Sequence, residues 1–142
     1  MAEVIYLDAN VLIALIEASL PLTDGQAAFV ANIDSGKIVA VTSELALAEC
    51  LVKPLADSNV KAVEAYNQLF SEAGNLSVRP VSRAILTSAA ALRAATRLKL
   101  PDAIHLATAN EAGCSEFVTA DSDFKAVGCV AVRNWTLLEM IP

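Results

Sequence analysis

The sequence predicts an α/β protein in which helices cover both faces of a central, mainly parallel sheet of about five strands. Two observations lead to this fold class. Short β-type runs alternate along the chain with longer helix-like segments, and such alternation is typical of parallel sheets with helices on both faces. No linker, repeat or Pro/Gly-rich stretch divides the 142 residues, so we expect a single domain over 1–142.

VIYL at 4–7 and KIVAV at 37–41 are the strand-like runs of the first half of the chain. Thr23 and Gln26 match a capping box, which opens a helix. Glycine and proline supply most of the helix stops in this half. The helices expected here are 10–18; 23–33, ended by Gly36; 44–53, capped by Thr42 or Ser43 and closed by Pro54; and 58–73, stopped by Gly74 and Asn75.

LSVRPV at 76–81 is the third strand candidate, and Pro80 places it at an edge of the sheet because proline cannot donate to a strand ladder. Ser82 caps an Ala-rich helix that runs to about Leu98. Pro101 favours the first turn of the next helix, which Gly113 ends. The remaining elements are strands at 116–119 and 129–132 and a short helical tail after Asn134.

Composition excludes several classes of protein. With 56% hydrophobic residues the chain is too apolar to be disordered, yet no run approaches the about 20 apolar residues of a membrane span. VLIALI at 11–16 follows no basic segment and is interrupted by Glu17, so we expect a cytoplasmic protein without a signal peptide. Cys50, Cys114 and Cys129 form no CxxC pair, which argues against a zinc knuckle or a disulfide framework.

Acidic residues directly follow two of the predicted strands. Asp8 comes after the first strand, and Asp121 and Asp123 come after the fourth, where open α/β sheets gather their ligands. Asp102 begins a helix, and Glu49 lies within one. Each aspartate also has an ordinary interpretation, as a helix cap, as a charge at a helix N-terminus or as part of a turn.

Glu49 is harder to explain in that way. Its helix is apolar around most of its circumference, so we expect the helix to be largely buried. A buried carboxylate is costly unless it is paired, and Lys53, one turn later, is the ordinary partner. Alternatively the acids converge, and a divalent cation relieves their mutual repulsion. Such a cation would also let a chain of net charge −6 handle a phosphate-bearing substrate.

Four blocks, in order, resemble the PIN-domain ribonucleases, in particular the VapC-type toxins of type II toxin–antitoxin systems. The blocks are YLDANVLI, TSELALAEC, LPDAIHLATA and VTADSDF, and the match covers nearly the whole chain. The resemblance implies a PIN-like three-layer α/β/α fold and an endoribonuclease that uses Mg²⁺ or Mn²⁺ to hydrolyse RNA phosphodiester bonds. It further implies an RNA substrate, an antitoxin protein and a homodimer, with no role for a membrane.

The resemblance also assigns residues to the site. The implied set is Asp8, Glu49, Asp102 and Asp121 as catalytic and metal-binding residues, Asp123 as a weaker metal ligand, and Asn10, Thr119 and His105 as supporting residues. Thr119 would orient the acids or the attacking water, and Phe124 would pack this segment onto the core. The basic residues just before LPDAIH either steer RNA or complement a helix C-terminus; they are Arg93, Arg97 and Lys99.

Several alternatives stay open. The single histidine, His105, is either a general base or a residue hydrogen-bonded near the pocket. A haloacid-dehalogenase-like phosphatase also begins with Asp after its first strand, but its second Asp is Asn10 here. A receiver domain needs a phosphoacceptor after the third strand, where this chain has Arg79 and Pro80. A catalytically silent PIN-type module that binds RNA or protein is the non-enzymatic alternative.

Overall fold

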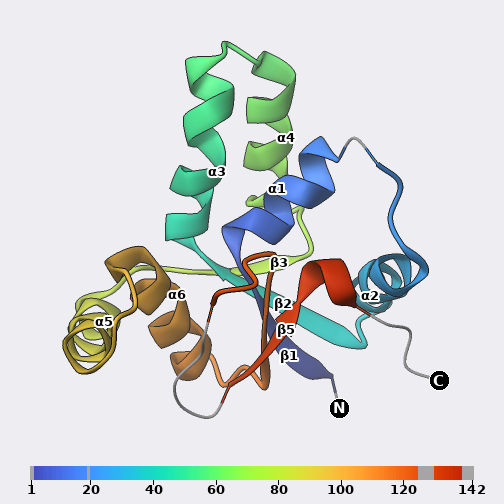
Figure 1. The fold of residues 1–142 in the computed structure, drawn as a ribbon. Helices are drawn as coiled ribbons and strands as arrows, with labels where there is room; N and C mark the ends of the chain where they lie inside the picture. Colours follow the sequence, from blue (N-terminus) through green and yellow to red (C-terminus); the bar gives the residue numbers. More distant parts are fainter. Residues whose placement is uncertain (1, 19, 125–129, 139–142) are drawn as a thin grey trace.

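The computed structural model describes residues 2–18, 20–124 and 130–138, and its centre is a five-stranded sheet (Figure 1). Each strand pairs in parallel with its neighbours, in the order β3-β2-β1-β4-β5. The strands are β1 (Glu3–Leu7), β2 (Ile38–Ser43), β3 (Leu76–Arg79), β4 (Glu116–Thr119) and β5 (Ala131–Asn134). The predicted parallel sheet is therefore confirmed, and Pro80 follows an edge strand as expected.

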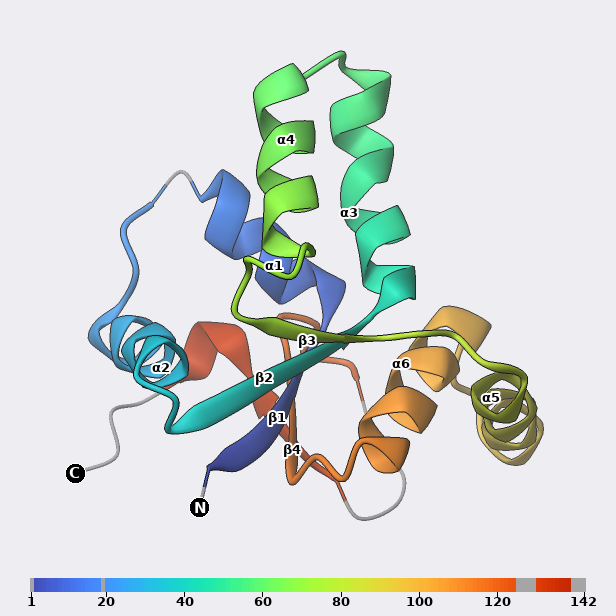
Figure 2. The ribbon, with the colours of Figure 1, turned by 180° about the vertical axis from the view of Figure 1, so that it is seen from behind.

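Helices cover both faces of the sheet. The helices are α1 (Ala9–Glu17), α2 (Asp24–Asp34), α3 (Glu44–Ala56), α4 (Val60–Leu69), α5 (Arg83–Ala95) and α6 (Leu100–Glu111), followed by the short 3₁₀ helix η1 (Trp135–Leu137). Figure 2 shows α5 beside α6, away from α1 and α2. In both ribbon views the α3–α4 hairpin projects from the body of the molecule (Figures 1 and 2).

Strand alternation explains the two hydrophobic layers. Ile5 and Leu7 of β1 point to the face covered by α1 to α4, where they pack with Leu12. Tyr6, between them, points to the opposite face and packs with Leu106 of α6. Because successive side chains of a strand alternate between faces, one short strand contributes to both cores. No helix among the described residues is long and apolar enough to cross a membrane.

Several predicted boundaries were wrong. Helix α3 continues through Pro54 to Ala56, because a proline in the last turn removes only one backbone donor. The next helix is shorter than predicted and ends at Leu69, well before Gly74. A Cβ at Gly74 would lie 2.0 Å from the Leu69 carbonyl oxygen, so this glycine serves the close return of the chain rather than the helix end.

Two further boundaries differ near the ends of α5 and β5. Helix α5 ends at Ala95, because the Thr96 hydroxyl donates to the Leu92 carbonyl and the backbone turns extended there. Strand β5 runs over Ala131–Asn134 rather than 129–132, and Cys129 lies outside the described residues. The capping box of Thr23 with Gln26 is confirmed, and Ser43 rather than Thr42 caps α3.

Candidate metal centre

The carboxyl ends of β1 and β4 lie next to each other in the sheet, since Leu7 pairs with Val118. Asp8 therefore begins helix α1 beside the end of β4, and its backbone N–H donates to the Val118 carbonyl at 3.0 Å. Its Oδ1 accepts from the Ala9 N–H at 2.8 Å, so Asp8 does cap α1. The Asp8 side chain is nonetheless at the carboxyl ends of the strands, where ligands of α/β proteins gather.

Thr119 joins the two acidic segments through its hydroxyl. Its Oγ1 donates to Asp8 Oδ2 at 2.9 Å and accepts from the Asp121 N–H at 3.1 Å. Asn10 Nδ2 lies 3.2 Å from the same hydroxyl and 3.3 Å from Asp8 Oδ2. The Asn10 Oδ1 in turn accepts from the Ala120 N–H at 2.9 Å. These bonds fix the Asp8 carboxylate and the chain leading to Asp121 as one unit.

Asp102, in the first turn of α6, lies within electrostatic reach of the other acids. Burial, followed by the negative charge of Asp8, raises the pKa of the Asp102 carboxyl above its ordinary value. Asp121 and Glu49 raise this pKa further, while His105 lowers it. Carboxylates that raise one another's pKa repel, and a cation between them would remove that repulsion.

The acids are not gathered into ligand geometry as they stand. Among residues 2–18, 20–124 and 130–138, no group of three or more His, Cys, Asp or Glu side chains is placed to hold a metal ion. Their oxygens accept protein hydrogen bonds instead: Asp121 Oδ1 accepts from the Asp123 N–H at 2.9 Å. The donor set still fits Mg²⁺ or Mn²⁺ in kind, because hard cations prefer carboxylate oxygens.

The prediction that the helix of Glu49 is largely buried was wrong. Its side chain is 37% exposed, and α3 leaves the apolar side chains of Val52 and Leu55 exposed as well. Within the described part of the chain, no ion pair joins Glu49 to Lys53. The Glu49 Oε1 instead lies 2.5 Å from Nε2 of His105.

His105 is buried among polar partners. Its side chain is 1% exposed, its Nδ1 is 2.5 Å from the Tyr6 hydroxyl, and its Nε2 is 3.8 Å from Asp8 Oδ1. Both ring nitrogens are engaged, which favours a hydrogen-bonding role over a general base.

Sequence reasoning missed Tyr6. The signal was present, because strand alternation points Tyr6 away from the face of Ile5 and Leu7.

The remaining predicted residues lie at the margin of the site. Asp123 is exposed in the turn after β4, whereas Phe124 is buried and stacks on Phe117 with ring centroids 4.5 Å apart, as predicted. The three basic residues are exposed near the junction of α5 and α6: Arg93, Arg97 and Lys99. Arg93 donates to the Leu98 carbonyl at 2.7 Å, so it also stabilises this junction.

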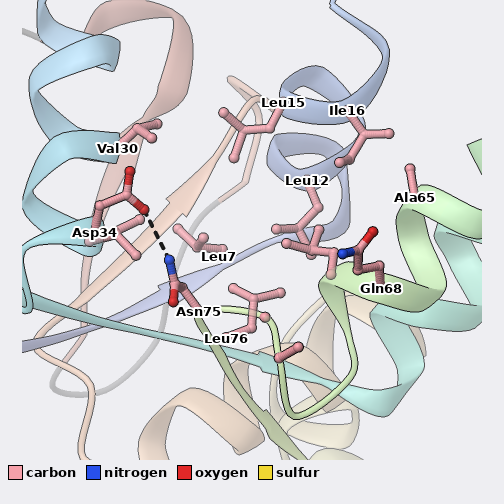
Figure 3. Close-up of a pocket in the computed structure, with 14 residues that line it drawn as sticks. Leu7, Leu12, Leu15, Ile16, Val30, Asp34, Ala65, Gln68, Asn75 and Leu76 are labelled. Atoms are coloured by element: carbon pink, nitrogen blue, oxygen red, sulfur yellow. Dashed lines mark hydrogen bonds between the residues drawn. The ribbon is translucent and has the colours of Figure 1, made fainter.

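A separate apolar groove lies between α1, α2 and α4 (Figure 3). Its volume is about 400 Å³, and Leu12, Leu15 and Ile16 of α1 form one wall. Among the lining residues that the structure describes, Asp34 is the one titratable residue, and its Oδ1 accepts from the Asn75 side chain at 3.0 Å. The groove therefore lacks the acids that a metal site needs, and its lining would fit an apolar ligand.

Comparison with known proteins gives one family match. The PIN domain model matches residues 5–129. A toxin–antitoxin complex from Klebsiella pneumoniae is 24% identical, with a TM-score of 0.65, and the alignment covers 89% of this chain and 94% of that one. No curated protein matches the chain.

Two other solved structures are similar. VapBC2 from Rickettsia felis, bound to promoter DNA, has a TM-score of 0.72 at 15% identity and covers 93% of this chain and 98% of its own. Mycobacterium tuberculosis VapC20, a toxin that cleaves the sarcin–ricin loop, has a TM-score of 0.64 at 19% identity, with 84% and 91% covered. At these identities the likeness concerns the fold, and it confirms the predicted three-layer arrangement.

Proposed function

This chain belongs to the PIN domain family, and from that premise we propose that it is a divalent-metal-dependent endoribonuclease, the toxin of a toxin–antitoxin pair. One observation carries the proposal. Four acids lie near the carboxyl ends of the strands; they come from the ends of β1 and β4, from α3 and from α6. They are close enough that Asp8, Asp121 and Glu49 all raise the pKa of Asp102. A cation bound among these carboxylates would neutralise their mutual repulsion, which explains why the acids lie so close together.

Asp8, Glu49, Asp102 and Asp121 would hold Mg²⁺ or Mn²⁺, with Asp123 as a weaker ligand. A bound ion of this kind lowers the pKa of a water molecule and stabilises negative charge on phosphoryl oxygens.

The protein's own contribution is positional. Thr119 and Asn10 both hydrogen-bond to Asp8 Oδ2, so the Asp8 carboxylate keeps one orientation. His105 holds Glu49 in the same way. Both nitrogens of His105 are engaged, so we assign it no proton transfer.

The proposed substrate and partners follow from different observations. Arg93, Arg97 and Lys99 are exposed close in sequence to Asp102 and would contact RNA phosphates. Two of the similar structures are of toxin–antitoxin complexes, which supports an antitoxin partner for this chain; the homodimer is proposed from the sequence resemblance alone. Size-exclusion chromatography with light scattering, with and without the product of the neighbouring gene, tests both partners: a monomer that never co-elutes contradicts them.

The cleavage test uses purified protein, total bacterial RNA and Mg²⁺ or Mn²⁺, with new 5′ ends mapped by sequencing. Parallel samples contain EDTA or the Asp8→Asn variant, whose fold is checked by circular dichroism. We expect discrete new ends that disappear in both controls. If folded protein free of antitoxin produces no ends with either ion, the nuclease proposal is wrong, and the catalytically silent binding module replaces it.

A further inference from the structure

A chain of buried polar groups connects the sheet to Glu49. Tyr6 of β1 is 0% exposed, and its hydroxyl lies 2.5 Å from Nδ1 of His105 on α6. The Nε2 of His105 lies 2.5 Å from Oε1 of Glu49 on α3. Three elements distant in sequence thus meet in one hydrogen-bonded line. The sequence assigned His105 and Glu49 to the site, but it did not assign Tyr6.

Hydrogen-bond chemistry gives the line a direction. A phenol has an ordinary pKa of about 10, so the Tyr6 hydroxyl is protonated at neutral pH. A carboxylate only accepts hydrogen bonds. In the Nε2–H tautomer of the imidazole, Nε2 donates to Glu49 and Nδ1 accepts from the Tyr6 hydroxyl. The opposite tautomer would turn a lone pair toward both Glu49 and Asp8.

The two ends of the line differ in how firmly they are held. The Tyr6 ring stacks on Phe117, with centroids 5.0 Å apart and planes 14° apart, and meets the His105 ring edge-on. The Glu49 side chain, in contrast, is 37% exposed on a hairpin that projects from the body (Figure 1). A long, half-exposed side chain keeps much of its rotamer freedom unless a partner restrains it.

We propose that Tyr6 is a positioning residue for the metal centre: it selects the Nε2–H tautomer of His105, which holds Glu49 beside Asp8. This inference rests on the proposed function, since it takes Glu49 and Asp8 as metal ligands. In metal sites, partners that fix a ligand's tautomer or orientation change metal affinity about 10- to 100-fold when they are removed. Tyr6 would act indirectly, because it contacts His105 and His105 in turn contacts the Glu49 carboxylate.

The test compares Tyr6→Phe with a matched control, Tyr66→Phe. Tyr66 is also 0% exposed and also donates its hydroxyl to a glutamate, Glu17, but it does not contact His105. Calorimetric titration measures Mn²⁺ affinity for each protein. We expect Tyr6→Phe to weaken Mn²⁺ binding about 10-fold and Tyr66→Phe to leave it within about twofold of the wild type. Equal affinity of Tyr6→Phe and the wild type would overturn the proposal.

A second measurement needs no metal. His105 is the only histidine in the chain, so the ¹⁵N NMR spectrum contains a single imidazole. We expect the Nε2–H tautomer in the wild type at pH 7.5 and a mixture of tautomers in Tyr6→Phe. An Nδ1–H tautomer in the wild type overturns the proposal even if Tyr6→Phe does not fold. If the wild type binds no Mn²⁺ and cuts no RNA, the proposed function fails, whereas the tautomer still reports on Tyr6.

Discussion

Replacing Thr119 with valine removes one hydroxyl from the point where β1, α1 and the segment after β4 meet. Valine has nearly the shape of threonine, and position 119 is 0% exposed, so the substitution changes hydrogen bonding with little change in packing. The hydroxyl donates to Asp8 Oδ2 at 2.9 Å and accepts from the Asp121 N–H at 3.1 Å and from Asn10.

The expected loss follows from these bonds. A hydrogen bond to a charged group contributes about 1.5–3 kcal/mol, and a partly buried N–H that loses its acceptor costs about 1 kcal/mol more. Thr119→Val should therefore lower the free energy of unfolding by about 2–4 kcal/mol. The Asp8 carboxylate also loses one of the hydrogen bonds that orient it, so RNA cleavage should fall even where the variant is fully folded.

Urea denaturation followed by circular dichroism measures the stability of Thr119→Val, Thr119→Ser and the wild type. Serine keeps the hydroxyl and loses only a buried methyl group, about 1 kcal/mol, so it serves as the matched control. A Thr119→Val protein that unfolds within about 0.5 kcal/mol of the wild type would refute the idea that this hydroxyl ties the two acidic segments together.

Three further changes test other parts of the structure. Burial and Asp8 raise the pKa of Asp102, so an ionised Asp102 destabilises the metal-free fold. This penalty is fully present above the raised pKa and vanishes as the pH falls below the ordinary pKa of an aspartate. Asp102→Asn should therefore raise the Tm at pH 7.5 and lose this advantage below about pH 4. Burial, then Glu49, raises the pKa of Cys50 to about 12, and burial raises that of Cys114 to about 11, so iodoacetamide at pH 8 should label both only in urea, as peptide mapping would show. Phe124→Ala removes a ring stacked at 4.5 Å and should cost about 3 kcal/mol in urea denaturation, whereas a loss below about 1 kcal/mol would contradict its role as an anchor.

Much of the fold could be predicted because its signals are local. A capping box needs only Thr23 and Gln26, four residues of chain. Gly36 and Gly113 follow helices with φ of +83° and +71°, which glycine adopts without strain. That Asp8 and Asp121 lie at the same end of the sheet follows from the rule that the carboxyl ends of parallel strands point the same way, whereas the structure shows that their strands are neighbours.

The exposure of Glu49 could not be predicted in this way. An apolar helix is expected to be covered, but the sequence does not say by what. In the structure α3 pairs with α4 in a hairpin that projects from the sheet (Figure 2), so Val52 and Leu55 stay exposed and the Glu49 side chain is 37% exposed. The acidic residue was identified correctly in sequence, while its environment was not.

The sequence by itself determined the element types, the parallel sheet and the four acid-bearing blocks, because each depends on residues within a few positions of one another. Tertiary structure alone decided which side chains meet. Tyr6 and His105 are 99 positions apart, and His105 and Glu49 are 56 apart. Alternation in β1 assigns Tyr6 to one face of the sheet, but only the order β3-β2-β1-β4-β5 and the packing of α6 on that face bring a histidine to its hydroxyl.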